Sequence, residues 1–439
     1  MFRSIDTLIA DLADKRILIL GFGREGRSSY AFLRKHFPDK PLGIADKNNI
    51  TLTDPAVALH CGAQYLDAMG DYDIVLKSPG IPFVGVDIPP RCTVSCQTDL
   101  FLKYSDSTVI GVTGTKGKTT TATLIFRMLQ AAGLRARLVG NVGVPVLDHI
   151  GEAENEITVM ELSCHQLEFM TTSPHIAVIT NIYEEHLDHY NNGFAGYLAA
   201  KMNIAAHQQA NDFFIYNPKS TAGDYITPET LPAKVILADP TAPDAFLDEL
   251  AAANPHLRGS HNRQNICVAM AVVRRLGVPD AAIRKAILDF EGIANRMELV
   301  GIYNEVAYYN DSIATIPYSV IMGVDSLGNV GSLLIGGMDR GLDYQAFADQ
   351  LARRQIDNII CLPDTGHKIA ELLQERHCRS NIVLAADMEE AVRAAVKLTP
   401  KGKACVLSPA AASYNVYRDF EEKGNHFKTL VKQYGKQHA

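Results

Sequence analysis

Three features are scarce in this chain of 439 residues, and each absence argues against a class of protein. The sequence has no run of Lys and Arg, and its net charge of −7 argues against a nucleic-acid partner, since such proteins usually carry a basic domain. No apolar stretch reaches the roughly 18 residues of a membrane-spanning helix, and the N-terminus lacks the apolar core of a signal peptide. The eight cysteines include no CxxC pair, which argues against zinc and fits a reducing compartment. We therefore expect a cytoplasmic protein that does not insert into membranes.

The length and the order of apolar runs predict three α/β domains. A prior of about 150 residues per domain gives roughly three domains. Short apolar runs alternate with helical patterns throughout, which is typical of mostly parallel sheets. We identify three strands in the first block and four in each of the others, with looser loops from about 219 to 255. The predicted domains are residues 1–97 and 293–439, both Rossmann-like, and residues 98–292, a phosphate-loop ATPase domain.

The strongest signal for function is a glycine-rich loop between a predicted strand and helix, Gly114-Thr115-Lys116-Gly117-Lys118-Thr119-Thr120. Backbone N–H groups of such a loop converge on phosphate oxygens, aided by the positive end of the helix. Lys118 would reach the β- and γ-phosphates of a nucleoside triphosphate, and the Thr119 hydroxyl would bind Mg²⁺. The strict GxxxxGK[ST] pattern is not met, because Val112 stands where its first glycine would fall.

A second glycine motif, Gly21-x-Gly23-x-x-Gly26, also follows an apolar run and opens a helical pattern. Asp46 lies 20 residues beyond Gly26, a spacing that fits a dinucleotide fingerprint. The motif alone leaves three readings open: a nicotinamide site, a site for another nucleotide, or a tight structural turn.

Three further side chains are candidates for chemistry. Glu161 follows an apolar strand, and a carboxylate at that end of a parallel strand points toward the ligand crevice, where it could bind Mg²⁺. His186 also lies just past a strand, and Lys201 lies in an Ala-rich helical segment. Taken singly, Glu161 could be a solvated acid, His186 is more often structural, and Lys201 is more often a solvated lysine.

Ten motifs follow one another in an order that resembles the Mur ligase family over essentially the whole chain. They are TGTKGKTT, GNVGVP, ELSCHQLE, NIYEEHLDHY, AAKMNI, GSHNRQN, NRME, NDSIAT, GGMDRGLD and LSPAAASYNVYRDFEEKGNHF. The match is closest to the members that add glutamate to UDP-N-acetylmuramoyl-L-alanine in peptidoglycan synthesis. The resemblance implies a UDP-binding first domain, an ATPase second domain and a glutamate-binding third domain, in a monomeric enzyme.

The resemblance also implies a reaction and its cofactors. A carboxylate is a poor electrophile, so ATP would first phosphorylate it, and the amine of glutamate would attack the resulting acyl phosphate. Two Mg²⁺ ions and Lys118 would screen the negative charge that gathers between ATP and the substrate. Lys201 matches a lysine that is carbamylated by CO₂, which would turn it into an oxygen ligand.

Roles for single residues follow from the same resemblance. The catalytic residues would be Lys118, His186 and Lys201, and the metal ligands Thr119, Glu161, His186 and carbamylated Lys201. ATP would contact the loop residues Gly114, Thr115, Lys116, Gly117, Lys118, Thr119 and Thr120, together with Asn262, Asn265, Arg296 and Asp311. The UDP-muramoyl substrate would contact Gly23, Arg24, Glu25, Asp46, Lys47, Asn141 and Ser163. Glutamate would contact Thr315, Arg340, Ser413 and Phe420.

The chain departs from the commoner family pattern at four positions. Lys116 replaces an asparagine, Asn295 a histidine, and Ile313 and Arg340 each replace a lysine. Arginine is a forked donor suited to carboxylates, so Arg340 could hold the glutamate differently. The Asp-Ser-Ile and Asp-Arg-Gly motifs resemble a subgroup that adds L-glutamate. We expect D-glutamate as the substrate and keep L-glutamate as the alternative.

Three other functions compete with this interpretation. The first is a related ATP-dependent amino-acid ligase, of which the folylpolyglutamate type is disfavoured because that group lacks the N-terminal glycine motif. An NAD-dependent oxidoreductase would leave the ATP loop unexplained. A catalytically inactive nucleotide-binding module should have lost some of the candidate side chains, yet all four are present: Lys118, Glu161, His186 and Lys201.

Overall fold

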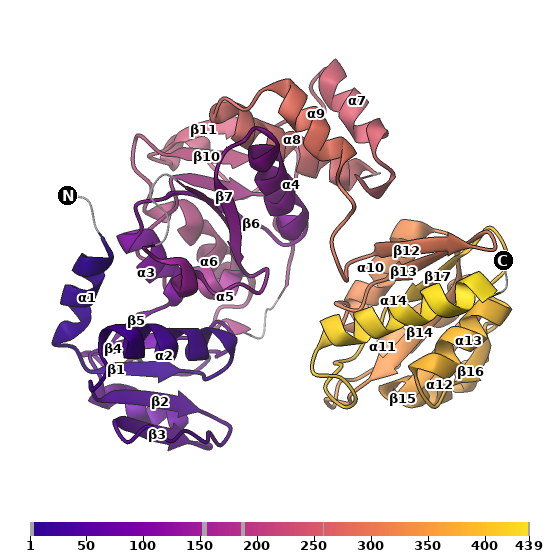
Figure 1. Cartoon of the computed structure of the whole chain (residues 1–439), viewed down its shortest axis with the longest axis horizontal. Coiled ribbons are helices and arrows are strands. Elements are labelled where there is room, and N and C mark those ends of the chain that lie inside the picture. The colour runs from indigo at the N-terminus through magenta and orange to yellow at the C-terminus, as the bar shows by residue number, and fades with distance from the viewer. Residues whose placement is uncertain (1–3, 152–155, 186–188, 258, 438–439) are drawn as a thin grey trace. The chain divides into compact units, whose positions relative to one another are not determined.

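The computed structural model describes residues 4–151, 156–185, 189–257 and 259–437. Contacts divide the chain into two compact units, Met1–Phe290 and Glu291–Ala439 (Figure 1). Among the described helices, none combines the length and apolar character that crossing a bilayer requires. Each unit is described by itself below.

The first unit begins with a five-stranded parallel sheet in the order β3-β2-β1-β4-β5. Its strands are β1 (Ile17–Leu20), β2 (Leu42–Asp46), β3 (Val57–Cys61), β4 (Ile74–Lys77) and β5 (Thr93–Ser95). The helices around it are α1 (Ile5–Ala13), α2 (Arg24–His36), the 3₁₀ segment η1 (Tyr65–Asp71) and α3 (Gln97–Tyr104). Successive β1 residues alternate between two cores, one with α1 and α2 and the other with η1, so the strand is buried on both faces.

The same unit holds a six-stranded parallel sheet in the order β11-β10-β9-β6-β8-β7. Its strands are β6 (Thr108–Thr113), β7 (Ala136–Gly140), β8 (Ile157–Glu161), β9 (Ile176–Ile179), β10 (Phe213–Tyr216) and β11 (Lys234–Leu237). Its α-helices are α4 (Lys118–Ala131), α5 (Cys164–Leu167), α6 (Phe194–Ala206), α7 (Ala245–Ala253), α8 (Ser260–Arg275) and α9 (Asp280–Leu288). Short 3₁₀ segments are η2 (Val146–His149), η4 (Pro228–Thr230) and η5 (Pro255–Leu257). Gly133, with φ of 76°, follows the end of α4 as the sequence predicts.

The second unit is a six-stranded sheet in the order β12-β13-β17-β14-β15-β16, in which only the β12–β13 pairing is antiparallel. Its strands are β12 (Glu298–Tyr303), β13 (Val306–Asn310), β14 (Val330–Gly337), β15 (Asn358–Asp364), β16 (Asn381–Leu384) and β17 (Ala404–Leu407). Its helices are α10 (Pro317–Leu327), α11 (Gln345–Ala352), α12 (Thr365–Glu375), α13 (Met388–Leu398) and α14 (Phe420–Gln437). The cores with α10–α12 and with α13–α14 cover opposite faces of the sheet.

The predicted α/β class with mostly parallel sheets is confirmed, but the strand number is not. Each sheet has two more strands than expected: β3 and β5, β7 and β11, and β12 and β16. These six are short or partly exposed, so none forms the strong apolar run by which the others are recognised. The sheets lie within the three predicted residue ranges, whose limits stay predictions.

One hydrophobic core joins the first two sheets within the first unit. It runs from Leu8 and Leu12 of α1 through Phe101 of α3 to Leu162 and Ile179 beside the second sheet. Polar contacts add to it: the Ser28 hydroxyl donates to Asp148 across 2.6 Å. The two glycine motifs are therefore carried by one continuous body.

The glycine motif after β1 offers a test of this packing. A Cβ added at Gly26 would lie 1.9 Å from the Gly21 carbonyl oxygen, whereas a Cβ at Gly23 would meet nothing within 4 Å. We expect Gly26→Ala to lower the free energy of unfolding by about 3 kcal/mol or more, since backbone must move, and Gly23→Ala to change it by less than about 1 kcal/mol. Circular dichroism in urea would measure both. Equal stabilities of the two variants would contradict the described loop.

Candidate active site

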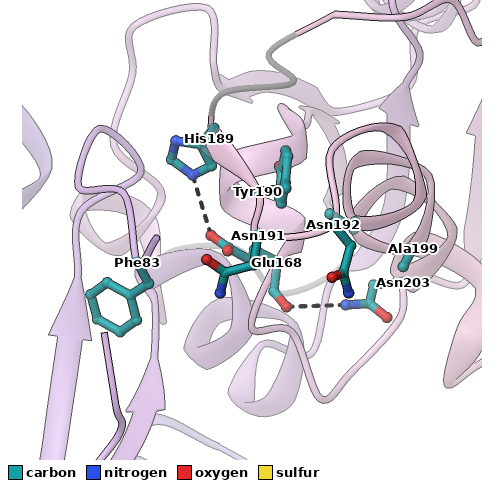
Figure 2. A pocket seen from close by; sticks show the side chains of 10 residues that line it. Phe83, Glu168, His189, Tyr190, Asn191, Asn192, Ala199 and Asn203 are labelled. Atoms are coloured by element: carbon teal, nitrogen blue, oxygen red, sulfur yellow. Dashed lines mark hydrogen bonds and ion pairs between the residues drawn. The ribbon is translucent and has the colours of Figure 1, made fainter. Parts of the chain in front are cut away.

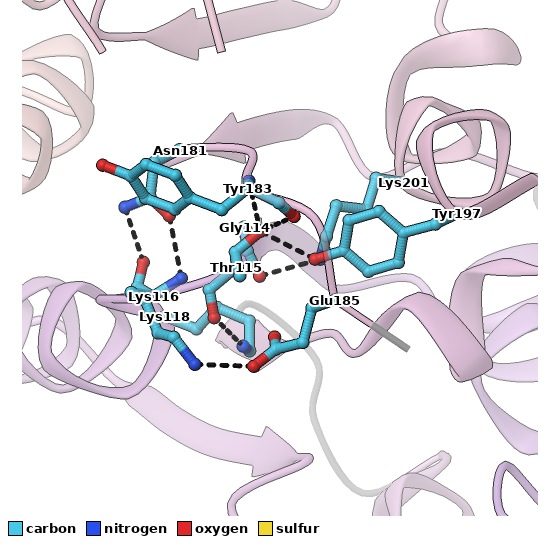
Figure 3. A network of polar contacts seen from close by, with 9 residues as sticks. All are labelled: Gly114, Thr115, Lys116, Lys118, Asn181, Tyr183, Glu185, Tyr197 and Lys201. Atoms are coloured by element: carbon cyan, nitrogen blue, oxygen red, sulfur yellow. Dashed lines mark hydrogen bonds and ion pairs between the residues drawn. The ribbon is translucent and has the colours of Figure 1, made fainter. Parts of the chain in front are cut away.

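The glycine-rich loop connects β6 to α4, and its backbone requires glycine at two points. Gly114 and Gly117 have φ of 145° and 82°, and a Cβ at either would lie within 2.4 Å of a neighbouring side-chain oxygen. Lys118 and Thr119 open α4, so the free N–H groups of its first turn face the loop. The Lys118 ammonium donates to the Thr115 carbonyl across 3.0 Å (Figure 3).

The loop is clamped by Thr180 and Asn181, which the sequence analysis did not select. The Asn181 amide accepts from the Lys116 N–H at 2.8 Å and donates to the Lys116 carbonyl at 3.0 Å. The Thr180 hydroxyl donates to the same carbonyl at 2.6 Å. Both residues follow β9, the neighbour of β6, so the sheet order brings this clamp to the loop.

Asn262 and Asn265, predicted from the resemblance, lie on α8 beside the start of α4. Asn265 is 6% exposed, and its amide oxygen accepts from the Thr121 hydroxyl at 3.3 Å. The same oxygen would lie 2.4 Å from a Cβ at Gly117, so α8 packs directly on the loop. Asn265 also donates to Asn262 at 3.1 Å. The structure thus brings these two predicted ATP contacts to the phosphate loop.

Lys201 is buried rather than solvated. Its side chain on α6 is 1% exposed, and its ammonium donates to the Gly114 carbonyl at 2.8 Å. The Tyr197 ring lies 4.8 Å from the ammonium, and the Tyr197 hydroxyl lies 2.7 Å from that of Thr115. Burial, with a smaller contribution from the Lys118 charge, lowers the pKa of Lys201 to about 7. A lysine tuned in this way is a nucleophile near neutral pH.

Lys116, the first departure from the family pattern, forms an ion pair beside the loop. Its ammonium lies 2.6 Å from a carboxylate oxygen of Glu185 (Figure 3). Glu185 raises, and Lys116 lowers, the pKa of Lys201. The phosphate loop, Glu185 and Lys201 therefore act electrostatically on one another.

Glu161 ends β8 at the position paired with Val112 of β6, two residues before the loop. The carboxylate is 2% exposed, and one oxygen accepts from the Asn141 amide at 2.7 Å. Its other oxygen has no hydrogen-bond partner among the described residues. A buried carboxylate oxygen left open in this way fits an oxygen-preferring cation such as Mg²⁺.

The predicted metal set is only partly visible. His186 lies outside the described residues, and within them no three His, Cys, Asp or Glu side chains gather as a metal-binding group. Thr119 and Glu161 lie at the ends of the adjacent elements α4 and β8, and with Lys201 on α6 they are the predicted ligands that lie within the described residues.

Four of the seven predicted UDP-substrate contacts lie at the junction between the first two sheets. The Arg24 guanidinium donates to the Gly143 carbonyl at 2.9 Å, two residues beyond Asn141. Glu25 accepts from the Gln166 amide at 3.0 Å, and Ser163 caps the short helix that contains Gln166. Burial raises the pKa of Glu25 to about 7. Arg24, Glu25, Asn141 and Ser163 are thus brought to one region.

Asp46 holds the backbone around the first glycine motif. Its carboxylate accepts from the Phe22 N–H at 2.8 Å and, through the other oxygen, from the Asn48 N–H at 2.8 Å. Gly23 and Lys47 are exposed on either side. The acid therefore orders the backbone around the predicted UDP-substrate contacts.

In the second unit, loops from three adjacent strands meet at the carboxyl edge of the sheet. The Ala410 N–H donates to the Ala314 carbonyl at 2.9 Å, and Met338 forms a bridge with Ala412. These contacts gather the predicted glutamate residues Thr315, Arg340 and Ser413. The buried Ser413 hydroxyl has no hydrogen-bond partner among the described residues, which suits it to a ligand.

Lys423 on α14 was missed by the sequence analysis. It is 2% exposed, its ammonium donates to the Gly336 carbonyl at 2.6 Å, and burial lowers its pKa to about 8. Phe420 begins the same helix. The Arg340 guanidinium lies 5.6 Å from the centre of the Tyr414 ring. The region therefore carries a buried cation, Lys423, beside the exposed cation Arg340.

A cavity of about 260 Å³ lies in the first unit, and Ala200, the neighbour of Lys201 on α6, is among its lining residues (Figure 2). Glu168 lines it and lies 3.5 Å from His189 and 3.3 Å from the buried Lys77 ammonium. The Lys77 ammonium is flanked by the rings of Phe83 and Phe169. The cavity contains none of the predicted site residues, so it does not alter the assignment.

Together, the strand–loop–helix unit, the buried lysine and the open buried carboxylate define an α/β enzyme that uses a nucleoside triphosphate. Two family models match the chain: the Mur ligase middle domain over residues 112–238 and the Mur ligase glutamate ligase domain over residues 295–411. A curated relative from Symbiobacterium thermophilum, a UDP-N-acetylmuramoylalanine–D-glutamate ligase, is 34% identical over 85% of this chain and 87% of its own. A relative of the same name from Clostridium botulinum is 31% identical over 95% and 96%. The chain belongs to the Mur ligase family of ATP-dependent ligases.

Solved structures agree with the fold. The UDP-N-acetylmuramate–alanine ligase of Thermotoga maritima superposes with a TM-score of 0.56 at 17% identity, over 96% of this chain and all of the other. The MurF ligase of Thermotoga maritima in complex with ADP gives a TM-score of 0.56 at 15% identity, over 96% and 97%. These likenesses support the architecture alone.

The buried Lys201 predicts a pH-dependent stability. Its pKa falls from 10.5 when unfolded to about 7, so below pH 7 the folded protein buries a full charge. Between pH 7 and pH 10.5 Lys201 is protonated in the unfolded chain and neutral in the folded one. The destabilisation of the folded state by this lysine therefore decreases as the pH rises. We expect Lys201→Met to stabilise the protein by at most about 5 kcal/mol at pH 6, with the gain shrinking by about 1.4 kcal/mol per pH unit above pH 7.

Urea unfolding in CO₂-depleted buffer at pH 6 and pH 9 would measure this gain. Circular dichroism is the suitable signal, since the chain has no tryptophan. Lys219→Met is the matched control, because Lys219 is exposed in the same unit. A gain from Lys201→Met that is the same at both pH values would contradict the burial of a titrating ammonium.

Proposed function

We propose that the chain joins D-glutamate to the alanine carboxylate of UDP-N-acetylmuramoyl-L-alanine in peptidoglycan synthesis, with hydrolysis of ATP. The chief support is the buried Lys201 ammonium against Gly114 of the phosphate loop, in a chain that matches ligases of this name along most of its length. The reaction would take place in the cytoplasm, where ATP is available, and we propose a monomer.

The chemistry follows from the weakness of a carboxylate as an electrophile. The substrate carboxylate attacks the γ-phosphorus of ATP, the bond to the β-γ bridging oxygen breaks, and an acyl phosphate and ADP result. The glutamate amine then attacks the acyl carbon, its nitrogen gives up a proton, and phosphate leaves as the carbonyl is restored. Lys118 and the α4 N-terminus hold the phosphates in line. Mg²⁺, held by Thr119 and Glu161, would neutralise part of the phosphate charge.

Lys201 is suited to carbamylation. Only a neutral amine attacks CO₂; a new N–C bond forms and a proton is released, which leaves an anionic carbamate. A pKa of about 7 keeps much of Lys201 neutral at physiological pH. The carbamate would supply oxygen atoms beside the phosphate loop, as an oxygen-preferring cation requires.

The second unit is proposed to bind glutamate through Thr315, Arg340, Ser413 and Phe420. Arg340 is exposed and offers a planar fork that fits a carboxylate with two parallel hydrogen bonds. Ile313 brings no charge where a lysine is common, so Arg340 would hold one carboxylate without that second cation. L-glutamate therefore remains the second candidate substrate.

A direct assay tests the proposal. The protein is incubated with ATP, Mg²⁺ and UDP-N-acetylmuramoyl-L-alanine, and phosphate release is measured with D-glutamate and, separately, with L-glutamate. We expect release with D-glutamate, with ADP and the glutamyl product in equal amounts. Release with L-glutamate alone would overturn the stereochemical assignment, and no release with either would overturn the ligase reaction.

Lys201→Ala should abolish nearly all turnover, because the carbamate has no other attachment point. Acetate or another short carboxylate, soaked into the space left by the side chain, should restore part of it. Lys219→Ala should keep full activity and gain nothing from acetate. Rates measured with and without acetate decide the matter; undiminished activity of Lys201→Ala would remove Lys201 from the site.

A further inference from the structure

The second unit begins with a tight turn three residues after the boundary between the units. The Arg296 N–H donates to the Ile293 carbonyl at 3.2 Å, which closes a four-residue turn. Asn295, the third residue of the turn, has φ of 62°, and Met297 just beyond it has φ of 43°. A left-handed backbone outside glycine is uncommon, and Asn is among the residues that tolerate it.

The Asn295 side chain lies at the centre of a buried polar cluster. Its amide oxygen accepts from the Asn310 amide at 2.9 Å and from the Ser312 hydroxyl at 3.3 Å. Asn310 and Ser312 are fully buried, and Asn295 is 7% exposed. Because these bonds are shielded from water, losing the shared acceptor leaves buried donors unsatisfied.

The backbone of Asn295 is held as firmly as its side chain. Its N–H donates to a Glu298 carboxylate oxygen at 2.9 Å, and its carbonyl accepts from the Ile313 N–H at 3.2 Å. Lys428 of α14 donates to the other oxygen of Glu298 at 3.0 Å. These bonds tie the turn to β12, β13 and α14 of the second unit.

Gly424 of α14 packs against the polar cluster of Asn295, Asn310 and Ser312. A Cβ at this position would lie 2.3 Å from the Asn295 amide oxygen, 2.5 Å from the Ser312 hydroxyl and 2.7 Å from the Asn310 amide nitrogen. The helix backbone therefore packs directly against the cluster.

Arg296 is the last residue of this turn. It follows Asn295 directly and is exposed, and its charge lowers the pKa of Asp311 against the stronger effect of burial. Asp311 in turn accepts from the Met297 N–H at 3.2 Å and from the Ser408 hydroxyl at 2.9 Å. Arg296 is thus bracketed by two residues whose backbones are fixed to the sheet.

We propose that Asn295 is a positioning residue that fixes Arg296 for a phosphate of ATP. The inference rests on the proposed function and on the resemblance, which implies that Arg296 contacts ATP. The strength of a guanidinium–phosphate contact depends on the orientation of its hydrogen bonds. A turn with several conformations would therefore weaken the contact without removing the charge. The hydrogen bonds of the Asn295 side chain, and not the left-handed backbone alone, hold that direction.

Two substitutions separate these contributions. Asn295→Gly keeps the left-handed backbone at no steric cost and removes the amide, and Asn295→Ala removes the amide and adds strain. Both should lower kcat/KM for ATP by about tenfold, as expected when one charge-assisted hydrogen bond is misdirected. The KM values for the muramoyl substrate and for glutamate should stay within about twofold.

The matched control is Asn304→Ala. Asn304 lies in the same unit, in the turn between β12 and β13, with φ of 50°. It shares the residue type and the strained backbone but belongs to another turn. We expect a small loss of thermal stability and no change in ATP kinetics. A fall in ATP kinetics as large as that of Asn295→Ala would mean that general strain, and not positioning, explains the effect.

A double-mutant cycle tests whether Asn295 acts on ATP kinetics through Arg296. If Asn295 acts through Arg296, Asn295→Gly should add less than about twofold to the loss already caused by Arg296→Ala. A full tenfold further loss in that background would overturn the proposal. So would wild-type ATP kinetics in Asn295→Gly, or equal losses for all three substrates.

Nucleotide binding separates this inference from the proposed function. The dissociation constant of an unreactive ATP analogue, measured by calorimetry on the full chain, should rise about tenfold in Asn295→Gly and in Arg296→Ala. Wild-type protein that binds the analogue but forms no muramoyl product would refute the function while leaving this result to decide the role of Asn295. An unchanged dissociation constant in Asn295→Gly would refute the positioning role.

Discussion

The hydrogen bonds between Asn181 and the backbone of Lys116 hold the phosphate loop in shape, and the rest of the site depends on that shape. A loop with two left-handed glycines would otherwise sample many conformations, at a cost in ordering when nucleotide binds. The clamp exists because β9 pairs with β6 and ends beside it. On the other side β8 ends at Glu161, so three neighbouring strands deliver the clamp, the loop and the carboxylate to one edge.

Lys201 packs against the same phosphate loop, and its burial destabilises the folded protein. A buried ammonium costs free energy, and the Lys118 charge adds to the cost. The carbonyl of Gly114 and the ring of Tyr197 offset part of it. A chain selected for stability alone would place an apolar side chain there. The retained lysine is therefore evidence for chemistry that needs an amine near its neutral form.

Sequence reasoning could predict what is local and could not predict what depends on distant partners. The strand, loop and helix around Gly114 follow from a contiguous motif, and the α/β class follows from the alternation of apolar runs. Asn181 bonds a residue 65 positions away, and Lys423 one 87 positions away, so no spacing reveals them. Edge strands such as β3 and β16 lack a strong apolar run because solvent covers one side of them.

Asp311 shows that a resemblance identifies a position without describing its surroundings. The resemblance implies that Asp311 contacts the nucleotide, which stays a prediction; in the structure Asp311 is 4% exposed, and both carboxylate oxygens accept hydrogen bonds from within the second unit. Burial raises its pKa to about 6, so the site holds this acid at a cost. In return, Asp311 fixes the backbone of Met297, which follows Arg296 in the sequence as Asn295 precedes it. An arginine whose backbone is held from both sides needs no further ordering of that backbone when it meets a phosphate, so a neighbouring residue can influence the affinity without touching the ligand.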